Sequence, residues 1–126
     1  MLEQFENQQY LNIETFRKSG EGVKTPVWFA RDGEDIYVWT KASSGKARRI
    51  RRDRDVKVTP STASGEPIGE WVNALATADA SPEALKHINQ LMKKKYGLAF
   101  AGFRLMGSFH KSSYTQIKIQ LSSKTE

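Results

Sequence analysis

The chain has 126 residues, a length typical of one domain, so we expect a single domain over residues 1–126 with one hydrophobic core. It contains no cysteine, which excludes disulfides, thiolate nucleophiles, cysteine-bound zinc and iron–sulfur clusters. The first residues do not form a signal peptide, and no apolar run approaches the roughly 18 residues that a membrane span needs. We therefore expect a soluble, cytoplasmic protein without membrane contacts.

The net charge of +6 is concentrated in one segment. Residues 40–55, TKASSGKARRIRRDRD, carry seven basic and two acidic side chains, a sum of +5, so the rest of the chain carries only +1. A uniformly basic surface, which would favour binding to nucleic acid, is thus not indicated. The function of this one basic segment is what needs explanation.

The first forty residues have the two-residue period of β-strands. Leu11, Ile13 and Thr15 alternate with the residues between them, as in a half-buried strand. Pro26 cannot donate a ladder hydrogen bond, so its strand belongs at an edge, a bulge or a barrel corner. After a short helical start, strands are predicted over residues 10–18, 23–30 and 36–40, with turns at 19–22 and 32–35.

A short helix is predicted over residues 45–53, inside the basic segment. Ser43 or Ser44 is a suitable N-cap. The only apolar positions of this helix are Ala47 and Ile50, a stripe that we expect to be too thin for a core helix.

The remaining pattern predicts more strands and two further helices. Ser81 is a suitable N-cap and Pro82 a suitable first helical residue, and Gly97 ends the helix. The sequence thus predicts a mainly β fold with helices, an antiparallel barrel that is closed or partly closed, with helices packed outside. The elements of this half are strands over 56–61, 69–78 and 114–121, a turn at 64–67, and helices over 81–97 and 98–109.

Few residues have the spacing of a catalytic or metal site. His87 and His110 begin no metal-binding motif, and we interpret His87 as an exposed helical residue. The acidic residues of 32–35 fit a hairpin turn. The lysines of 93–95 fit a solvated helix end. The sequence contains no nucleophile-elbow motif. We therefore predict no metal and no dedicated catalytic side chain.

The basic segment allows three interpretations. Ser44-Gly45-Lys46-Ala47 is similar to the end of a nucleotide-binding Walker A loop, but Thr40 replaces its first glycine and Ala47 its magnesium-binding hydroxyl, which excludes nucleotide hydrolysis. A phosphate could still bind the helix start beside Lys46. Nucleic-acid binding is less favoured because residues 40–55 contain no aromatic residue. A purely solvated helix is the third interpretation.

One long stretch resembles a known family. The run TPVWFARDGEDIYVWTKASSGKARRIRRDRDVKVTP, followed by GEWVNALATA and KKKYG, is similar to the pyridoxamine 5′-phosphate oxidase-like split barrels. It looks most like their small members that are grouped as coenzyme F-420-dependent. The resemblance covers residues 9–121. It implies a split β-barrel homodimer that binds FMN or coenzyme F-420 at the subunit interface.

The resemblance also implies a cofactor site, residue by residue. One strand would run along the tricyclic ring and the ribityl chain, the next would contact the ribityl and phosphate region, and the helix start would hold the phosphate. A tryptophan on a later strand would approach the ring from across the dimer. The residues so implied are Lys24, Thr25, Pro26, Val27, Trp39, Thr40, Ser44, Lys46, Arg49 and Trp71.

Two departures from the family pattern shape the expected activity. The sequence ends soon after Leu121, without the basic C-terminal region of pyridoxamine phosphate oxidases, so we do not expect that activity. Their Ser-Arg-Lys is Ser-Gly-Lys here, with Gly45 in the middle. The expected function is an oxidoreductase that transfers a hydride between FMN or coenzyme F-420 and a small organic substrate, and the alternative is a carrier or sensor without turnover.

Overall fold

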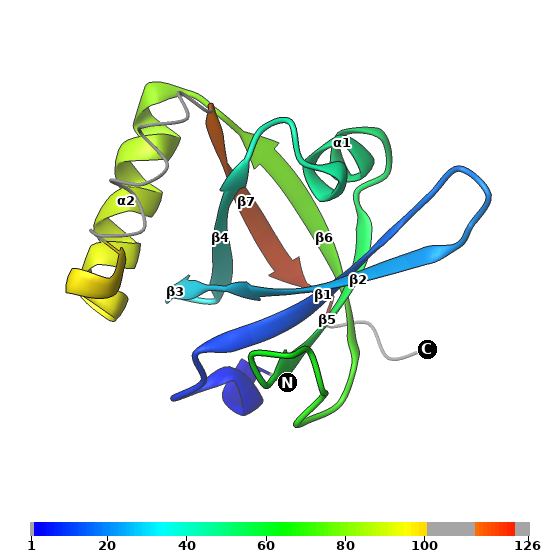
Figure 1. The fold of residues 1–126 in the computed structure, drawn as a ribbon, viewed down its shortest axis with the longest axis horizontal. Helices are drawn as coiled ribbons and strands as arrows, with labels where there is room; N and C mark the ends of the chain where they lie inside the picture. Colours follow the sequence, from blue (N-terminus) through cyan, green and yellow to red (C-terminus); the bar gives the residue numbers. More distant parts are fainter. Residues whose placement is uncertain (1, 101–112, 123–126) are drawn as a thin grey trace.

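The computed structural model describes residues 2–100 and 113–122, and in them one antiparallel sheet curls into a barrel (Figure 1). This confirms the predicted fold class. The strands are β1 (Tyr10–Phe16), β2 (Gly22–Trp28), β3 (Ala30–Asp32), β4 (Asp35–Lys41), β5 (Asp55–Ser61), β6 (Val72–Asp79) and β7 (Tyr114–Leu121). The helices are the 3-10 helix η1 (Leu2–Phe5), α1 (Gly45–Arg52) and α2 (Pro82–Tyr96). The strand order is β2-β1-β5-β6-β7-β4-β3.

The two edge strands of this sheet are consecutive in the chain. β2 and β3 lie at opposite ends of the strand order, yet only Phe29 separates them in sequence. The strand predicted over 23–30 is therefore broken at Phe29, where the chain leaves β1 and joins β4. This bend carries the chain from one edge of the sheet to the other, so the sheet curls into a barrel that stays split between β2 and β4. Pro26 lies on edge strand β2, which confirms its predicted place.

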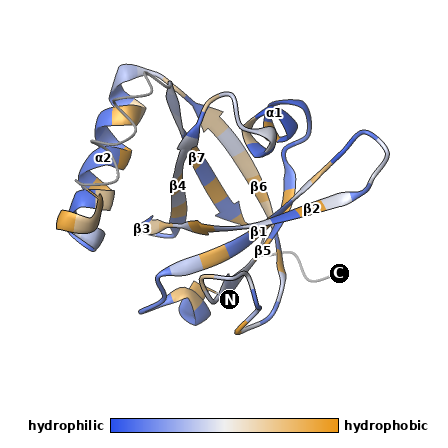
Figure 2. Ribbon diagram, viewed as in Figure 1, coloured by the Kyte–Doolittle hydropathy of each residue, from blue (hydrophilic) through white to orange (hydrophobic). Residues whose placement is uncertain are grey.

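The barrel interior is the main hydrophobic core, and α1 contributes to it. Inward-facing residues of the strands, such as Leu11, Val58 and Ile119, are fully buried. Ala47 and Ile50 are also fully buried, and Ile50 belongs to the same cluster. The prediction that the apolar stripe of this helix is too thin for the core is thus wrong. Because α1 is short, the side chains of Ala47 and Ile50 suffice to pack it against β1 and β6. Figure 2 shows how hydrophilic the rest of α1 is.

Helix α2 packs on the outside of the barrel. It contacts β3, β4 and β7, and a second cluster of buried residues lies between, with Tyr37 from β4 and Ile88 and Met92 from α2. The predicted ends are confirmed: the Ser81 hydroxyl caps the helix start, and Gly97 (φ 60°) ends it. Residues 98–100 are helical, and the rest of the helix predicted over 98–109 lies outside the described residues.

The strand predicted over 69–78 begins at Val72, so Trp71 precedes it.

None of the helices in the described part of the chain is long and apolar enough to cross a membrane.

Candidate functional site

A hollow of about 350 Å³ lies where the barrel is split between β2 and β4. Its volume and mostly apolar lining are in the range of small-molecule sites. It is lined by Tyr10, Pro26, Val27, Trp28, Trp39, Thr40, Lys41, Lys46 and Tyr114.

The split has a simple origin in strand register. β3 pairs with β4 from Asp32–Asp35 to Ala30–Tyr37, and there the ladder stops. If it continued, residues 28, 27 and 26 would face residues 39, 40 and 41. These six residues line the hollow instead, because residues 22–28 pair with β1. The hollow therefore occupies the place of the missing ladder, and Pro26, which has no N–H to donate, lies on the edge of β2 that is left open.

Aromatic rings form the walls. Trp39 stacks on Tyr114 of the neighbouring strand, with 4.2 Å between ring centroids and 14° between planes. On the opposite side, Tyr10 meets Trp28 edge-on at 6.5 Å. Flat, rigid walls of this kind suit a planar aromatic ligand because stacked and edge-on ring contacts are favourable.

Cations lie at the rim of the hollow. Lys46, in the first turn of α1, is partly buried, and burial, followed by the charge of Arg49, lowers the pKa of its amine. Among the described residues, no carboxylate lies within ion-pair distance of Lys46. Lys41, at the end of β4, lines the same hollow. A bound anion would offset the unfavourable burial of Lys46.

The start of α1 brings three predicted residues together. The Ser44 oxygen accepts a hydrogen bond from the Ala47 N–H at 3.2 Å and so caps the helix, while its own O–H can still donate. The first N–H groups of the helix have no intrahelical acceptor. Arg49 folds back over this start and is held by a 2.7 Å hydrogen bond from its Nε to Thr15 Oγ1. Burial, and then three nearby arginines, lower the pKa of Arg49.

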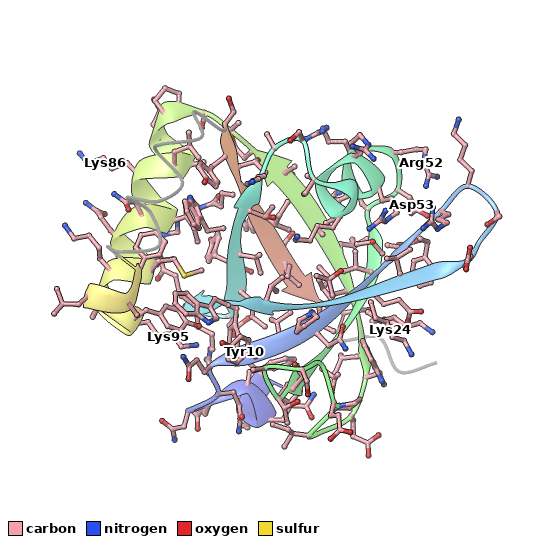
Figure 3. The ribbon with its side chains drawn as sticks, viewed as in Figure 1. Tyr10, Lys24, Arg52, Asp53, Lys86 and Lys95 are labelled. Carbon is pink, nitrogen blue, oxygen red and sulfur yellow. The ribbon has the colours of Figure 1, made fainter. Side chains whose placement is uncertain are left out.

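The basic residues that follow are exposed but held in place. Arg48 donates to the carbonyl of Ser43, Arg51 to that of Ala42, and Arg52 to that of Phe16. Figure 3 shows Arg52 beside the β1–β2 hairpin. These bonds fix the guanidinium groups without neutralising them. The flank of the basic segment thus stays positively charged.

Not every predicted site residue lies in the hollow. Pro26, Val27, Trp39, Thr40 and Lys46 line it, and Ser44 and Arg49 lie at the adjoining helix start. The other three lie elsewhere: Thr25 pairs with Ile13, and the Lys24 amine lies 5.2 Å from the centre of the Trp71 ring. Figure 3 shows Lys24 well separated from Tyr10.

Sequence reasoning missed four lining residues. Trp28 stands inside the motif that carries the family resemblance, and Lys41 was counted only as part of the basic segment. Tyr10 and Tyr114 begin strands β1 and β7. The sequence carries a signal for Trp28, because it is an aromatic residue next to predicted site residues on a strand that is expected at an edge. Tyr114 could be placed only once the pairing of β7 with β4 was known.

A second hollow, of about 640 Å³, is larger but less suited to a cofactor. It lies over β5, β6 and β7, and residues such as Asn73, Leu75 and Gln120 line it. Its lining contains one aromatic residue, Phe16, and one basic residue, Lys57. The smaller hollow combines stacked rings with Lys41 and Lys46, and Lys46 has no carboxylate partner in the described part of the chain, so we regard this hollow as the candidate site.

His87 does not behave as predicted. Instead of a freely exposed helical residue, it is a partly buried bridge: its Nε2 lies 2.8 Å from Asp32 Oδ2 and its Nδ1 2.9 Å from Gln116 Nε2. The contact joins α2 to β3 and β7. His87 does not line the hollow, and the described residues hold no cluster suited to a metal ion. His110 lies outside the described residues.

Known proteins resemble this chain in structure, but the sequence comparisons find no match. Searches against protein-family models and curated proteins find no match. A proposed pyridoxamine 5′-phosphate oxidase from Listeria innocua is 17% identical with a TM-score of 0.68, over 97% of this chain and 90% of that one. The heme storage protein HutZ from Vibrio cholerae is 13% identical with a TM-score of 0.72, over 97% of this chain and 87% of HutZ. An F-420 reductase is 15% identical with a TM-score of 0.62, over 96% of this chain and 92% of the reductase.

These likenesses define the class of fold. The chain has the split-barrel fold of pyridoxamine 5′-phosphate oxidase-like proteins, which confirms the resemblance predicted from the sequence at the level of fold. The similar structures include a heme storage protein besides a reductase. The fold therefore limits the class of function without selecting a ligand or a reaction.

Proposed function

We propose that the chain is a flavin- or deazaflavin-dependent oxidoreductase that binds FMN or coenzyme F-420 in the hollow between β2 and β4. The observation that carries this proposal is the pairing of a flat aromatic cavity with a partly buried lysine that lacks a carboxylate partner among the described residues. A cofactor with a planar ring at one end and a phosphate at the other matches both features. When bound, such a ring supplies the hydride transfer.

The residues of the hollow divide into two roles. Trp28, Trp39 and Tyr114 offer flat surfaces to the ring and exclude water from it. Lys46, the Ser44 hydroxyl and the free N–H groups of α1 would hold the phosphate, with Arg49 beside them. This division of roles needs no general acid or base from the protein, and the described residues that line the hollow include no carboxylate and no histidine.

The choice between the two cofactors depends on the basic flank. One phosphate needs only the groups at the helix start. Coenzyme F-420 continues into an acidic tail, and the exposed guanidinium groups of Arg48, Arg51 and Arg52 are available to it. Each exposed pair would contribute about 0.2–1 kcal/mol. Tighter binding of coenzyme F-420 than of FMN, with a steeper salt dependence, would indicate that the flank binds the tail.

The proposal includes a homodimer, as the family resemblance implies. Trp71 lies outside the hollow of its own chain, against Lys24. In a dimer it would approach the ring bound by the partner subunit. Light scattering during size exclusion should give twice the mass of 14.3 kDa. A monomer that still binds cofactor would remove Trp71 from the site.

Titration with each cofactor tests the proposal. Quenching of tryptophan fluorescence should show saturable binding of FMN or coenzyme F-420, because Trp28 and Trp39 line the hollow. If neither binds, the proposed function is wrong. Anaerobic reduction of the bound cofactor, followed by reoxidation on addition of candidate organic acceptors, separates an enzyme from a carrier. A cofactor that binds but is reoxidised by no acceptor would favour the carrier.

A further inference from the structure

We propose that Tyr96, on the last turn of α2, is a positioning residue for the aromatic wall that Tyr10 and Trp28 form on one side of the hollow. For its effect on a ligand the inference rests on the proposed function, but the geometry behind it stands alone. Tyr96 itself does not line the hollow. Figure 3 shows Tyr10 and Lys95, the neighbour of Tyr96, at the end of the barrel where α2 ends.

The ring of Tyr96 supports Trp28 from behind. The two rings are stacked, with 4.3 Å between centroids and 6° between planes, and Tyr10 meets Trp28 edge-on. Trp28 thus lies between a helix residue and the hollow. Because a stacked ring resists tilting of its neighbour, Tyr96 sets the angle of the wall.

The hydroxyl of Tyr96 fixes the backbone on both sides of the same wall. It accepts the Phe29 N–H at 3.0 Å and lies 2.7 Å from each of two carbonyl oxygens, those of Gln9 and Phe29, to one of which it donates. Gln9 precedes Tyr10, and Phe29 follows Trp28. One hydroxyl therefore ties together the backbones of both wall residues at the bend between β2 and β3.

The surroundings keep this hydroxyl protonated. Burial raises the pKa of Tyr96, and the hydrogen bond to Phe29 opposes that rise only in part. The Phe29 carbonyl also accepts a 2.7 Å hydrogen bond from Lys95 Nζ. Because its hydroxyl stays protonated, Tyr96 should keep its hydrogen bonds to the backbone over the whole physiological pH range.

A positioning role makes a distinct prediction for ligands with and without a ring. If Tyr96 orients Trp28, Tyr96→Leu should weaken binding of FMN by about fivefold or more. Ribitol 5-phosphate, which lacks the tricyclic ring, should bind within about twofold of its affinity for the unaltered protein. Tyr96→Phe keeps the stack but loses the hydroxyl and should fall between. Lys46→Ala is the reference variant and should weaken both ligands.

A measurement without ligand separates this inference from the proposed function. In a chain with Trp39→Phe and Trp71→Phe, Trp28 is the only tryptophan, and acrylamide quenching reports its shielding. Adding Tyr96→Leu should raise the quenching constant about twofold or more, whereas Tyr96→Phe should leave it nearly unchanged. If Tyr96→Leu does not fold, as judged by circular dichroism, Tyr96→Met replaces it, because methionine also lacks a ring.

The outcomes are distinguishable. Failure of the unaltered protein to bind either cofactor would contradict the proposed function, and the Trp28 quenching would still decide whether Tyr96 orients the wall. Unchanged quenching in the ring-less variant overturns the positioning role. So does an equal loss of affinity for FMN and ribitol 5-phosphate, because a merely structural defect would weaken both.

Discussion

The guanidinium group of Arg49 occupies the space that a side chain at position 45 would fill. A Cβ atom added to Gly45 would lie 2.8 Å from Nη1 of Arg49 and 3.3 Å from Nη2. Here glycine opens the start of α1, and the guanidinium of a residue one turn later reaches the same place.

Gly45→Ala should therefore act through Arg49. Residue 45 is the first of α1 and has no left-handed backbone angle, so folding stability should change by less than about 1 kcal/mol. Affinity for FMN should fall a few-fold, by about 0.5–1.5 kcal/mol, as Arg49 is pushed from the helix start. Binding is measured by fluorescence titration, and stability by urea denaturation.

A double variant provides the control. If the alanine acts only by displacing Arg49, Gly45→Ala combined with Arg49→Ala should bind FMN as well as Arg49→Ala alone. Additive losses would mean that the methyl group itself obstructs the ligand.

Ile50→Ala should destabilise the protein strongly, because Ile50 is fully buried in the barrel core. Large-to-small changes at such sites cost about 2–5 kcal/mol. The matched control is Arg51→Ala, next in sequence and exposed, which should change the free energy of unfolding by less than about 0.5 kcal/mol. Similar midpoints of urea denaturation for the two variants would contradict the burial of α1.

Lys95 should give folding stability a pH dependence above neutrality. Its amine lies 3.6 Å from the centre of the Phe29 ring, and burial lowers its pKa to about 8 from 10.5. Between these pH values the unfolded chain binds a proton that the folded chain has released, so stability rises with pH there and is flat below pH 8. The residue as a whole is exposed, so we expect the rise to be at most about 1 kcal/mol.

Urea denaturation at pH 7.5 and 9.5 measures this effect in the unaltered protein and in Lys95→Met. The gain in stability should be smaller in the variant, which cannot titrate at this position. An equal gain in both would assign the pH dependence to other groups, such as Lys46, whose pKa is lowered in the same direction.

Local signals in the sequence predicted most of the elements. Capping chemistry predicted the helix ends at Ser81 and Gly97. The missing N–H of proline predicted the edge position of Pro26. Both effects act within a few residues. The alternation of Leu11 and Ile13 likewise predicted a strand whose inward face is buried. Because these effects are local, they can be read before any partner strand is known.

The parts that sequence reasoning missed depend on contacts between distant residues. Tyr114 stacks on Trp39 only because β7 pairs with β4. His87 meets Asp32 and Lys95 meets Phe29 because α2 crosses the outside of the barrel at that place. Tertiary position, rather than residue type, decided these roles, and hydrophobic periodicity does not encode which strands become neighbours.

The comparison of two lysines tests the candidate site most directly. Lys46 lies at the rim of the hollow, whereas Lys86 is exposed on α2, away from the hollow (Figure 3). In titrations with FMN and with coenzyme F-420, Lys46→Ala should lose about 1.5–3 kcal/mol of binding free energy, or about 10- to 150-fold in affinity. Lys86→Ala should bind both cofactors like the unaltered protein. Equal affinities of the two variants would contradict a phosphate site at Lys46.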